Sequence, residues 1–203
     1  MDNKSLLLKD RAPIRWTVLI LLSSMMFFAY MFVDVLSPLQ SLLESGKGWT
    51  PENYGTFASS EYFLNVFALF LIFAGVILDK IGVRSTALLS GGLMVLGAFI
   101  KYYAVSPAFA GTSVELWLNS WWTNFPASAK LASFGFMIFG CGVEMAGITV
   151  SKGIVKWFKG KEMALAMGIE MAIARLGVFA VFRISPRVAD AFSDLSAPVL
   201  MVL

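Results

Sequence analysis

Long apolar stretches, separated by short polar segments, run through this chain from its first quarter to its end. Five of them approach the ~20 residues that a helix needs to cross the ~30 Å hydrocarbon core of a bilayer. A further apolar stretch of nine residues would rise only about 13.5 Å as a helix, so we expect a sixth span that is incomplete. The pattern therefore predicts an all-α membrane protein: a polar N-terminal segment at 1–15, then a helical bundle at 16–203 with spans at about 16–37, 56–79, 85–103, 129–151 and 163–183 and the start of a sixth at 195–203.

Composition supports a membrane protein and excludes several chemistries. Apolar residues make up 58% of the 203 positions and charged residues only 14%, against about 25% charged in a soluble domain. The chain has no histidine, which excludes a histidine metal site or proton relay, and the lone Cys141 cannot form an internal disulfide. No nucleotide-binding motif is present, so a primary pump is disfavoured. We expect no enzymatic activity, no cofactor and no metal.

The basic residues gather in alternate connections between the spans. Ten Lys and Arg lie on the side of the N-terminus, against about five on the other side, where Lys101 sits near the end of the third span. This asymmetry predicts a cytoplasmic N-terminus, and it explains the net charge of +3 without nucleic acid. We expect the plasma (inner) membrane as the location.

The connection after the second span carries a specific spacing of glycines and charges. It reads Gly75, Asp79, Lys80, Gly82 and Arg84, which resembles the G-x-x-x-D-R/K-x-G-x-R/K loop of the major facilitator superfamily. The resemblance implies that these residues form a charge latch against a neighbouring helix end and bias which side of a transporter is open. Without the resemblance, the same residues would be an ordinary basic cytoplasmic loop.

Two opposite charges fall near the middle of consecutive spans. By helical rise, Glu144 lies about 12 Å and Arg175 about 18 Å from the cytoplasmic boundary. An ionised side chain at this depth is costly and marks a functional site by default. Either the two form a structural ion pair, or they bind the two ends of a small zwitterion. Asp34 and Glu61, both about 27 Å from the inner boundary, are either solvated helix ends or residues for gating or proton coupling.

The resemblance becomes closer in the fourth and fifth spans. Gly140-Cys-Gly-Val-Glu144, the W-F-K-G-K-E loop at 157–162 and Ala174-Arg175-Leu-Gly177 occur in the order found in the branch of the superfamily that includes the lysosomal dipeptide exporter. The resemblance implies that Glu144 contacts a dipeptide amino group and Arg175 its terminal carboxylate. One departure is Phe136, where many members have an arginine, so a proton-coupling role for that arginine does not carry over.

Together these features predict the N-terminal six-helix half of a twelve-span major facilitator fold, with a C-terminal half expected to complete it. The predicted function is secondary transport of a small zwitterionic solute, dipeptides or amino-acid-like compounds, by alternating access. Two alternatives stay open: transport of another small organic anion or a sugar, and a non-transporting accessory membrane protein. The expected partners are the substrate and the lipid bilayer, with no nucleic acid; the sequence does not indicate an accessory subunit.

Overall fold

Helices make up almost the whole of the computed structural model, which describes residues 8–203. Within these residues no strand occurs. The long helices are α1 (Ala12–Val33), α3 (Pro51–Phe67), α4 (Phe70–Val105), α6 (Ala127–Phe158) and α7 (Met163–Phe192). The short elements are η1 (Leu8–Asp10), η2 (Ser37–Leu39), α2 (Gln40–Lys47), η3 (Pro107–Phe109), α5 (Ser113–Asn119) and α8 (Ala197–Val202).

Four helical stretches of the described chain are long and apolar enough to cross a membrane: Ala12–Lys47, Phe70–Val105, Ala127–Phe158 and Met163–Phe192. The protein is therefore an all-α, multi-pass membrane protein, as the apolar pattern predicted. The expected polar segment at 1–15 is described only from residue 8 onward, so Lys4 lies outside the described residues.

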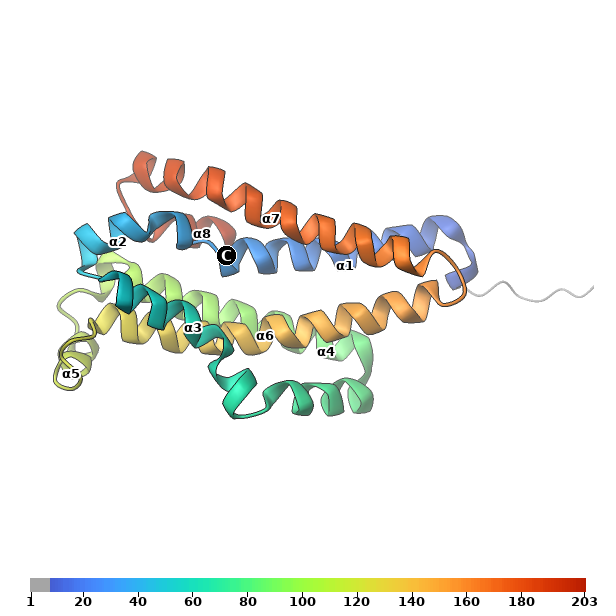
Figure 1. Cartoon of the computed structure of the whole chain (residues 1–203), viewed down its shortest axis with the longest axis horizontal. Coiled ribbons are helices and arrows are strands. Elements are labelled where there is room, and N and C mark those ends of the chain that lie inside the picture. The colour runs from blue at the N-terminus through green and yellow to red at the C-terminus, as the bar shows by residue number, and fades with distance from the viewer. Residues whose placement is uncertain (1–7) are drawn as a thin grey trace, which may run out of the picture.

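The helices form two layers, which Figure 1 shows one above the other. One layer holds α1, α2, α7 and α8, and the other holds α3, α4 and α6. The most extensive contacts lie within the layers, between α4 and α6, between α3 and α6, and between α1 and α7. Contacts between α1 and α6, which join the layers, are fewer. Residues that link α1 to the other layer therefore control how the two layers sit together.

Glycines explain why the helix pairs within each layer approach so closely. A Cβ placed on Gly97 of α4 would lie 2.5 Å from the carbonyl oxygen of Gly135 and the amide nitrogen of Phe139, both in α6. On the other layer, Gly177 of α7 lies directly against the backbone carbonyl of Phe27 in α1. Small residues at such positions let membrane helices pack through van der Waals contact, the main attraction between helices in lipid.

The expected second span at 56–79 is interrupted. Helix α3 ends at Phe67, Leu69 has a left-handed φ of 51°, and α4 begins at Phe70. A second break lies at Gly82, where a φ of 80° inside α4 turns the chain back. Figure 1 shows the part of α4 before this break running apart from α6. The sequence is apolar on both sides of Leu69, so hydropathy gave no sign of this interruption.

Helix α7 also continues further than expected. Pro186 lies inside the helix, which ends at Phe192 rather than near 183. Proline removes one backbone donor and usually kinks or ends a helix, which is why the sequence favoured a boundary before it. A helix can extend beyond the hydrocarbon core, so the end of the membrane span itself stays a prediction.

Candidate functional site

The two opposite charges of the fourth and fifth spans lie on α6 and α7. Glu144 is half-buried on α6, and Arg175 is exposed on α7. The guanidinium carbon of Arg175 lies 5.5 Å from the ring centre of Tyr30 on α1. Among residues 8–203, none of the ion pairs joins Glu144 to Arg175. The structure thus leaves each of the two charges open to a different partner.

A tyrosine-containing polar cluster connects these charges to the acids Asp34 and Glu61. Glu61, Glu144, Tyr30 and Asp34 all act electrostatically on the hydroxyl of Tyr62 on α3. Because Arg175 stacks on Tyr30, it adjoins the same group. We call this group the polar cluster; it consists of Tyr30 and Asp34 near the end of α1, Glu61 and Tyr62 on α3, Glu144 on α6 and Arg175 on α7. The sequence indicated its four charged members but neither tyrosine.

Asp34 and Glu61 differ in their surroundings. Asp34 follows the last residue of α1 and accepts a hydrogen bond of 3.0 Å from the hydroxyl of Ser37, which in turn accepts one of 3.0 Å from Tyr54. Glu61 lies within α3, is only 5% exposed, and packs with its backbone carbonyl directly against Gly140 of α6. Helix-end solvation therefore fits Asp34 and does not fit Glu61.

Lys101 is a buried cation that the sequence analysis assigned only to the outer end of a span. It is 0% exposed, and its ammonium donates a hydrogen bond of 3.0 Å to the carbonyl oxygen of Phe32. Its nitrogen lies 4.1 Å from the ring centre of Phe136, the position at which the sequence departs from the superfamily. A lysine inside an apolar run was the sequence signal for a buried charge. Its partners lie on other helices, so the sequence did not show them.

The predicted latch residues lie around the break in α4. Asp79 forms an ion pair of 2.6 Å with Lys152 on α6, so the acid of the motif does meet a neighbouring helix. Gly82 supplies the left-handed turn after it. Lys80 and Arg84 are exposed, and Gly75 has open space around its α-carbon. The pairing of Asp79 has the geometry of a latch, and its effect on the open state stays a prediction.

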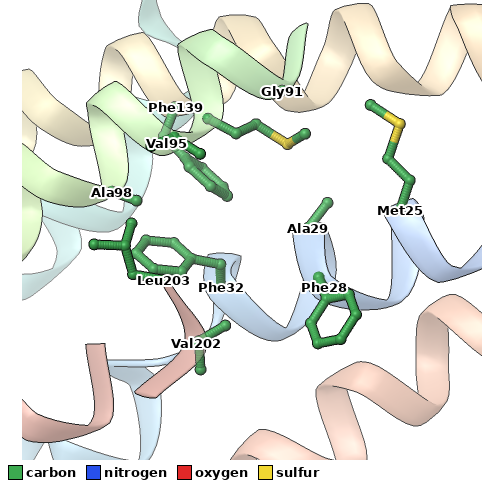
Figure 2. A pocket seen from close by; sticks show the side chains of 11 residues that line it. Met25, Phe28, Ala29, Phe32, Gly91, Val95, Ala98, Phe139, Val202 and Leu203 are labelled. Atoms are coloured by element: carbon green, nitrogen blue, oxygen red, sulfur yellow. The ribbon is translucent and has the colours of Figure 1, made fainter. Parts of the chain in front are cut away.

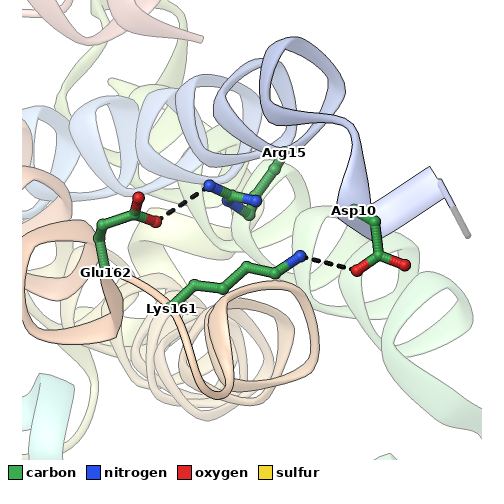
Figure 3. Close-up of polar contacts among 4 residues, drawn as sticks. All are labelled: Asp10, Arg15, Lys161 and Glu162. Carbon is green, nitrogen blue, oxygen red and sulfur yellow. Dashed lines mark hydrogen bonds and ion pairs between the residues drawn. The ribbon is translucent and has the colours of Figure 1, made fainter. Parts of the chain in front are cut away.

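Two further ion pairs at the same end of the bundle join η1 and the first turn of α1 to the W-F-K-G-K-E loop (Figure 3). Arg15 contacts Glu162 at 3.0 Å, and Lys161 contacts Asp10 at 2.9 Å. Arg15 is also 5.3 Å from the ring centre of Phe158, the last residue of α6. The loop therefore binds the beginning of α1. The partners are far apart in sequence, and the sequence analysis did not predict them.

The cavity of about 350 Å³ in Figure 2 lies between the layers, and no residue of the polar cluster lines it. Side chains of α1, α4, α6 and α8 line it, among them Met25, Phe32, Val95, Phe139 and Val202. All of its lining residues are apolar, and neither Glu144 nor Arg175 is among them. A zwitterion would find no polar partner there. Among the described residues, no group of His, Cys, Asp and Glu is placed to hold a metal ion.

The structure is that of an integral, multi-pass membrane protein with a polar cluster built from four of its helices. No family model matches the chain, and no solved structure matches it. Curated relatives do match. The human lysosomal dipeptide transporter MFSD1 is 26% identical over 169 residues, 83% of this chain and 32% of the human protein. Its Danio rerio counterpart is 27% identical over 164 residues, 80% of this chain and 31% of that protein.

A shorter match reaches 40% identity over 47 residues of the Gallus gallus protein of the same name, 23% of this chain and 11% of that protein. The chain spans about a third of the length of the human and fish relatives. The chain is thus similar to lysosomal dipeptide transporters, a resemblance that the motifs predicted. These relatives are named as lysosomal, whereas we expected the plasma membrane; the orientation of this chain stays a prediction.

Proposed function

We propose that this chain forms part of a secondary transporter that moves small zwitterions, above all dipeptides, across a membrane by alternating access. The observation that carries the proposal is the separation of Glu144 from Arg175: two opposite charges of one polar cluster, on different helices, without an ion pair between them. The names of the relatives support the substrate class.

The chemistry of a zwitterion matches the two charges. The planar guanidinium of Arg175 offers parallel donors that suit a carboxylate in a bidentate arrangement. The carboxylate of Glu144 suits an ammonium group. Because Arg175 is exposed while its ring partner Tyr30 is half-buried, the guanidinium is held on one side and accessible on the other. A simple organic anion would have no use for Glu144, and a sugar would use neither full charge.

The architecture also suits alternating access. In transporters built from helical repeats, substrate binds near the bilayer midplane and the layers rock around it. Here the ion pair of Asp79 with Lys152 joins α4 to α6 at one end, where rearrangement would open or close a path. The resemblance implies that a second helical half faces the polar cluster; this part of the proposal rests on the resemblance.

Binding to the purified full chain tests the proposal. Dipeptide affinity should fall at least tenfold in Arg175→Gln and in Glu144→Gln, because each variant loses a charge-assisted contact worth about 1.5–3 kcal/mol. Two matched controls lie on α7: Arg183, whose guanidinium stacks on Phe179 at 5.9 Å, and the half-buried Glu170. Arg183→Gln and Glu170→Gln should bind as the wild type does. Equal losses in the site variants and the controls would contradict the proposal.

A further inference from the structure

A groove of about 670 Å³ lies on the surface of the bundle, at the end where α3 and α6 begin. Helices α3 and α6 line it, and α5 with the chain that follows up to Phe125 forms a third side. Figure 1 shows α5 beside the beginning of α6 at this end. Most of the lining side chains are apolar, and Phe63, Trp117 and Phe134 among them are exposed. No residue of the polar cluster lines the groove, so it is separate from the proposed substrate site.

The two ends of the groove lie at different depths of a bilayer. Helix α6 has 32 residues and rises about 48 Å, slightly more than the ~40–45 Å of a bilayer with its headgroups. Lys130, in the first turn of α6, therefore lies at the level of the headgroups. Met137, further along the same wall of the groove, lies about 10 Å deeper, at the level of the hydrocarbon. A ligand that fits both ends has a polar head and an apolar tail.

Lys130 is the cation at the headgroup end of the groove. Its side chain is 7% exposed, and its ammonium donates hydrogen bonds to the backbone carbonyls of Leu118 and Trp121. An ammonium group has three donors, so one is left. None of the ion pairs among residues 8–203 includes Lys130. The first turn of a helix also carries partial positive charge, which favours an anion and disfavours a cation. An anion in the groove would accept the remaining hydrogen bond and balance the charge.

Three tryptophans line the same end: Trp117, Trp121 and Trp122. They are 65%, 45% and 61% exposed. In the described part of the chain, the indole that donates a hydrogen bond is that of Trp49, so the N–H groups of these three have no acceptor within the protein. An indole ring combines an apolar body with one donor, which suits the boundary between headgroups and hydrocarbon.

We propose that this groove binds one phospholipid of the surrounding bilayer, with its phosphate at Lys130 and an acyl chain between α3 and α6. The charge of Lys130, the free indole donors and the apolar wall are all used by such a ligand. Free phosphate would leave the apolar wall uncovered, and an apolar helix would leave Lys130 without an anion. The proposal does not depend on the transported substrate.

Native mass spectrometry of the full chain in detergent, titrated with phosphatidylglycerol, tests the proposal. The wild type should retain one tightly bound lipid. Lys130→Gln should weaken its binding at least about tenfold, because it removes a charge-assisted hydrogen bond and keeps a donor for the carbonyls. Lys156→Gln is the matched control, since Lys156 is exposed near the other end of α6 and should have no effect. Absence of a retained lipid in the wild type, or an equal loss in the two variants, would overturn the proposal.

Two ligand controls identify the bound species. Diacylglycerol, which lacks the phosphate, should bind the wild type at least about tenfold more weakly than phosphatidylglycerol does. Glycerol 3-phosphate, which lacks the acyl chains, should not displace the lipid. Equal binding of diacylglycerol would show that the phosphate is not recognised, and displacement by glycerol 3-phosphate would show a site for free phosphate. Either result would overturn the proposal.

A second variant keeps the test decisive if Lys130→Gln does not fold. Ser59 is exposed on α3 and lines the groove, so Ser59→Phe should fill the groove without touching Lys130. It should weaken lipid binding at an unchanged melting temperature. Ser41, exposed on α2 at the same end of the bundle, provides the control Ser41→Phe, which should bind lipid as the wild type does. Unchanged binding in Ser59→Phe, or an equal loss in Ser41→Phe, would contradict a lipid site between α3 and α6.

Discussion

The charged side chains inside the bundle differ in how far neighbouring groups of the same chain offset the cost of removing their charge from water. Lys101 is surrounded by aromatic rings from three other helices and donates a hydrogen bond to the carbonyl oxygen of Phe32. Arg175 has one tyrosine ring and is otherwise exposed, and Glu144 is half-buried without an ion pair. A charge that neighbouring groups stabilise on all sides has no room for a ligand. A charge with few such neighbours can still bind a ligand of opposite charge. On this basis Lys101 suits a structural role, and Glu144 and Arg175 are the proposed binding residues.

This distinction predicts how stability responds to substitution at the site. Because Arg175 is exposed and not paired to Glu144, Arg175→Gln and Glu144→Gln should each change the free energy of unfolding by less than about 1 kcal/mol. Removing one partner of a buried ion pair would cost about 3–5 kcal/mol. Thermal or denaturant unfolding in detergent decides between the two values. Unstable single variants that the double variant rescues would show that the two charges form a structural pair.

At the scale of elements, helix pairs with glycine contacts form rigid layers, and ion pairs at the helix ends join them to loops and to each other. Gly97 and Gly177 determine the α4–α6 and α1–α7 spacing. The Asp79–Lys152 pair at the helix ends is exposed at both side chains, whereas in the Arg15–Glu162 pair the arginine is buried. Exposed ion pairs contribute about 0–1 kcal/mol. The Asp79–Lys152 pair is therefore suited to switching between states of similar free energy, whereas the close glycine contacts are not.

Gly97→Ala tests the rigid contact. The added methyl group would lie 2.5 Å from two backbone atoms of α6, so α4 and α6 must move apart. Overpacking of this kind costs about 1–3 kcal/mol, which should appear as a lower melting temperature. Gly92 is the matched control on the same helix, because no atom lies within 4 Å of a Cβ placed there. Gly92→Ala should leave the melting temperature unchanged or raise it.

Asp79→Asn tests the switching contact. Its side chain is 79% exposed, so the substitution should barely alter stability, yet it removes the partner of Lys152 and should change the balance between open states. Labelling of a single cysteine from each side of the membrane measures that balance. Lys152→Asn should change it in the same direction, and Lys156→Asn, one turn further along α6 and exposed, should not. If cysteine labelling of Asp79→Asn matched that of the wild type, the motif would only set the orientation of the helices and would not control the open state.

At the scale of the whole molecule, the sequence predicted what depends on local pattern. Apolar runs located the long helices, and the spacing from Gly75 to Arg84 located the turn whose acid meets α6. The interruption at Leu69 was missed because hydropathy is uniform across it. The contacts of Lys101 and Arg15 were missed because they depend on helices far away in sequence, such as the Arg15–Glu162 pair, whose partners are 147 positions apart. These contacts depend on tertiary packing, which the local pattern of a single sequence does not show.

The central claim is that Glu144 and Arg175 bind opposite ends of one zwitterion, and substrate analogues test it most directly. Affinities of the full chain for a dipeptide, its N-acetylated form and its C-terminal amide should be measured in the wild type, Glu144→Gln and Arg175→Gln. Glu144→Gln should lose its preference for the free amine and keep the penalty for the amide. Arg175→Gln should show the reverse. If either variant weakened all three ligands by the same factor, the assignment of one charge to each end would be wrong.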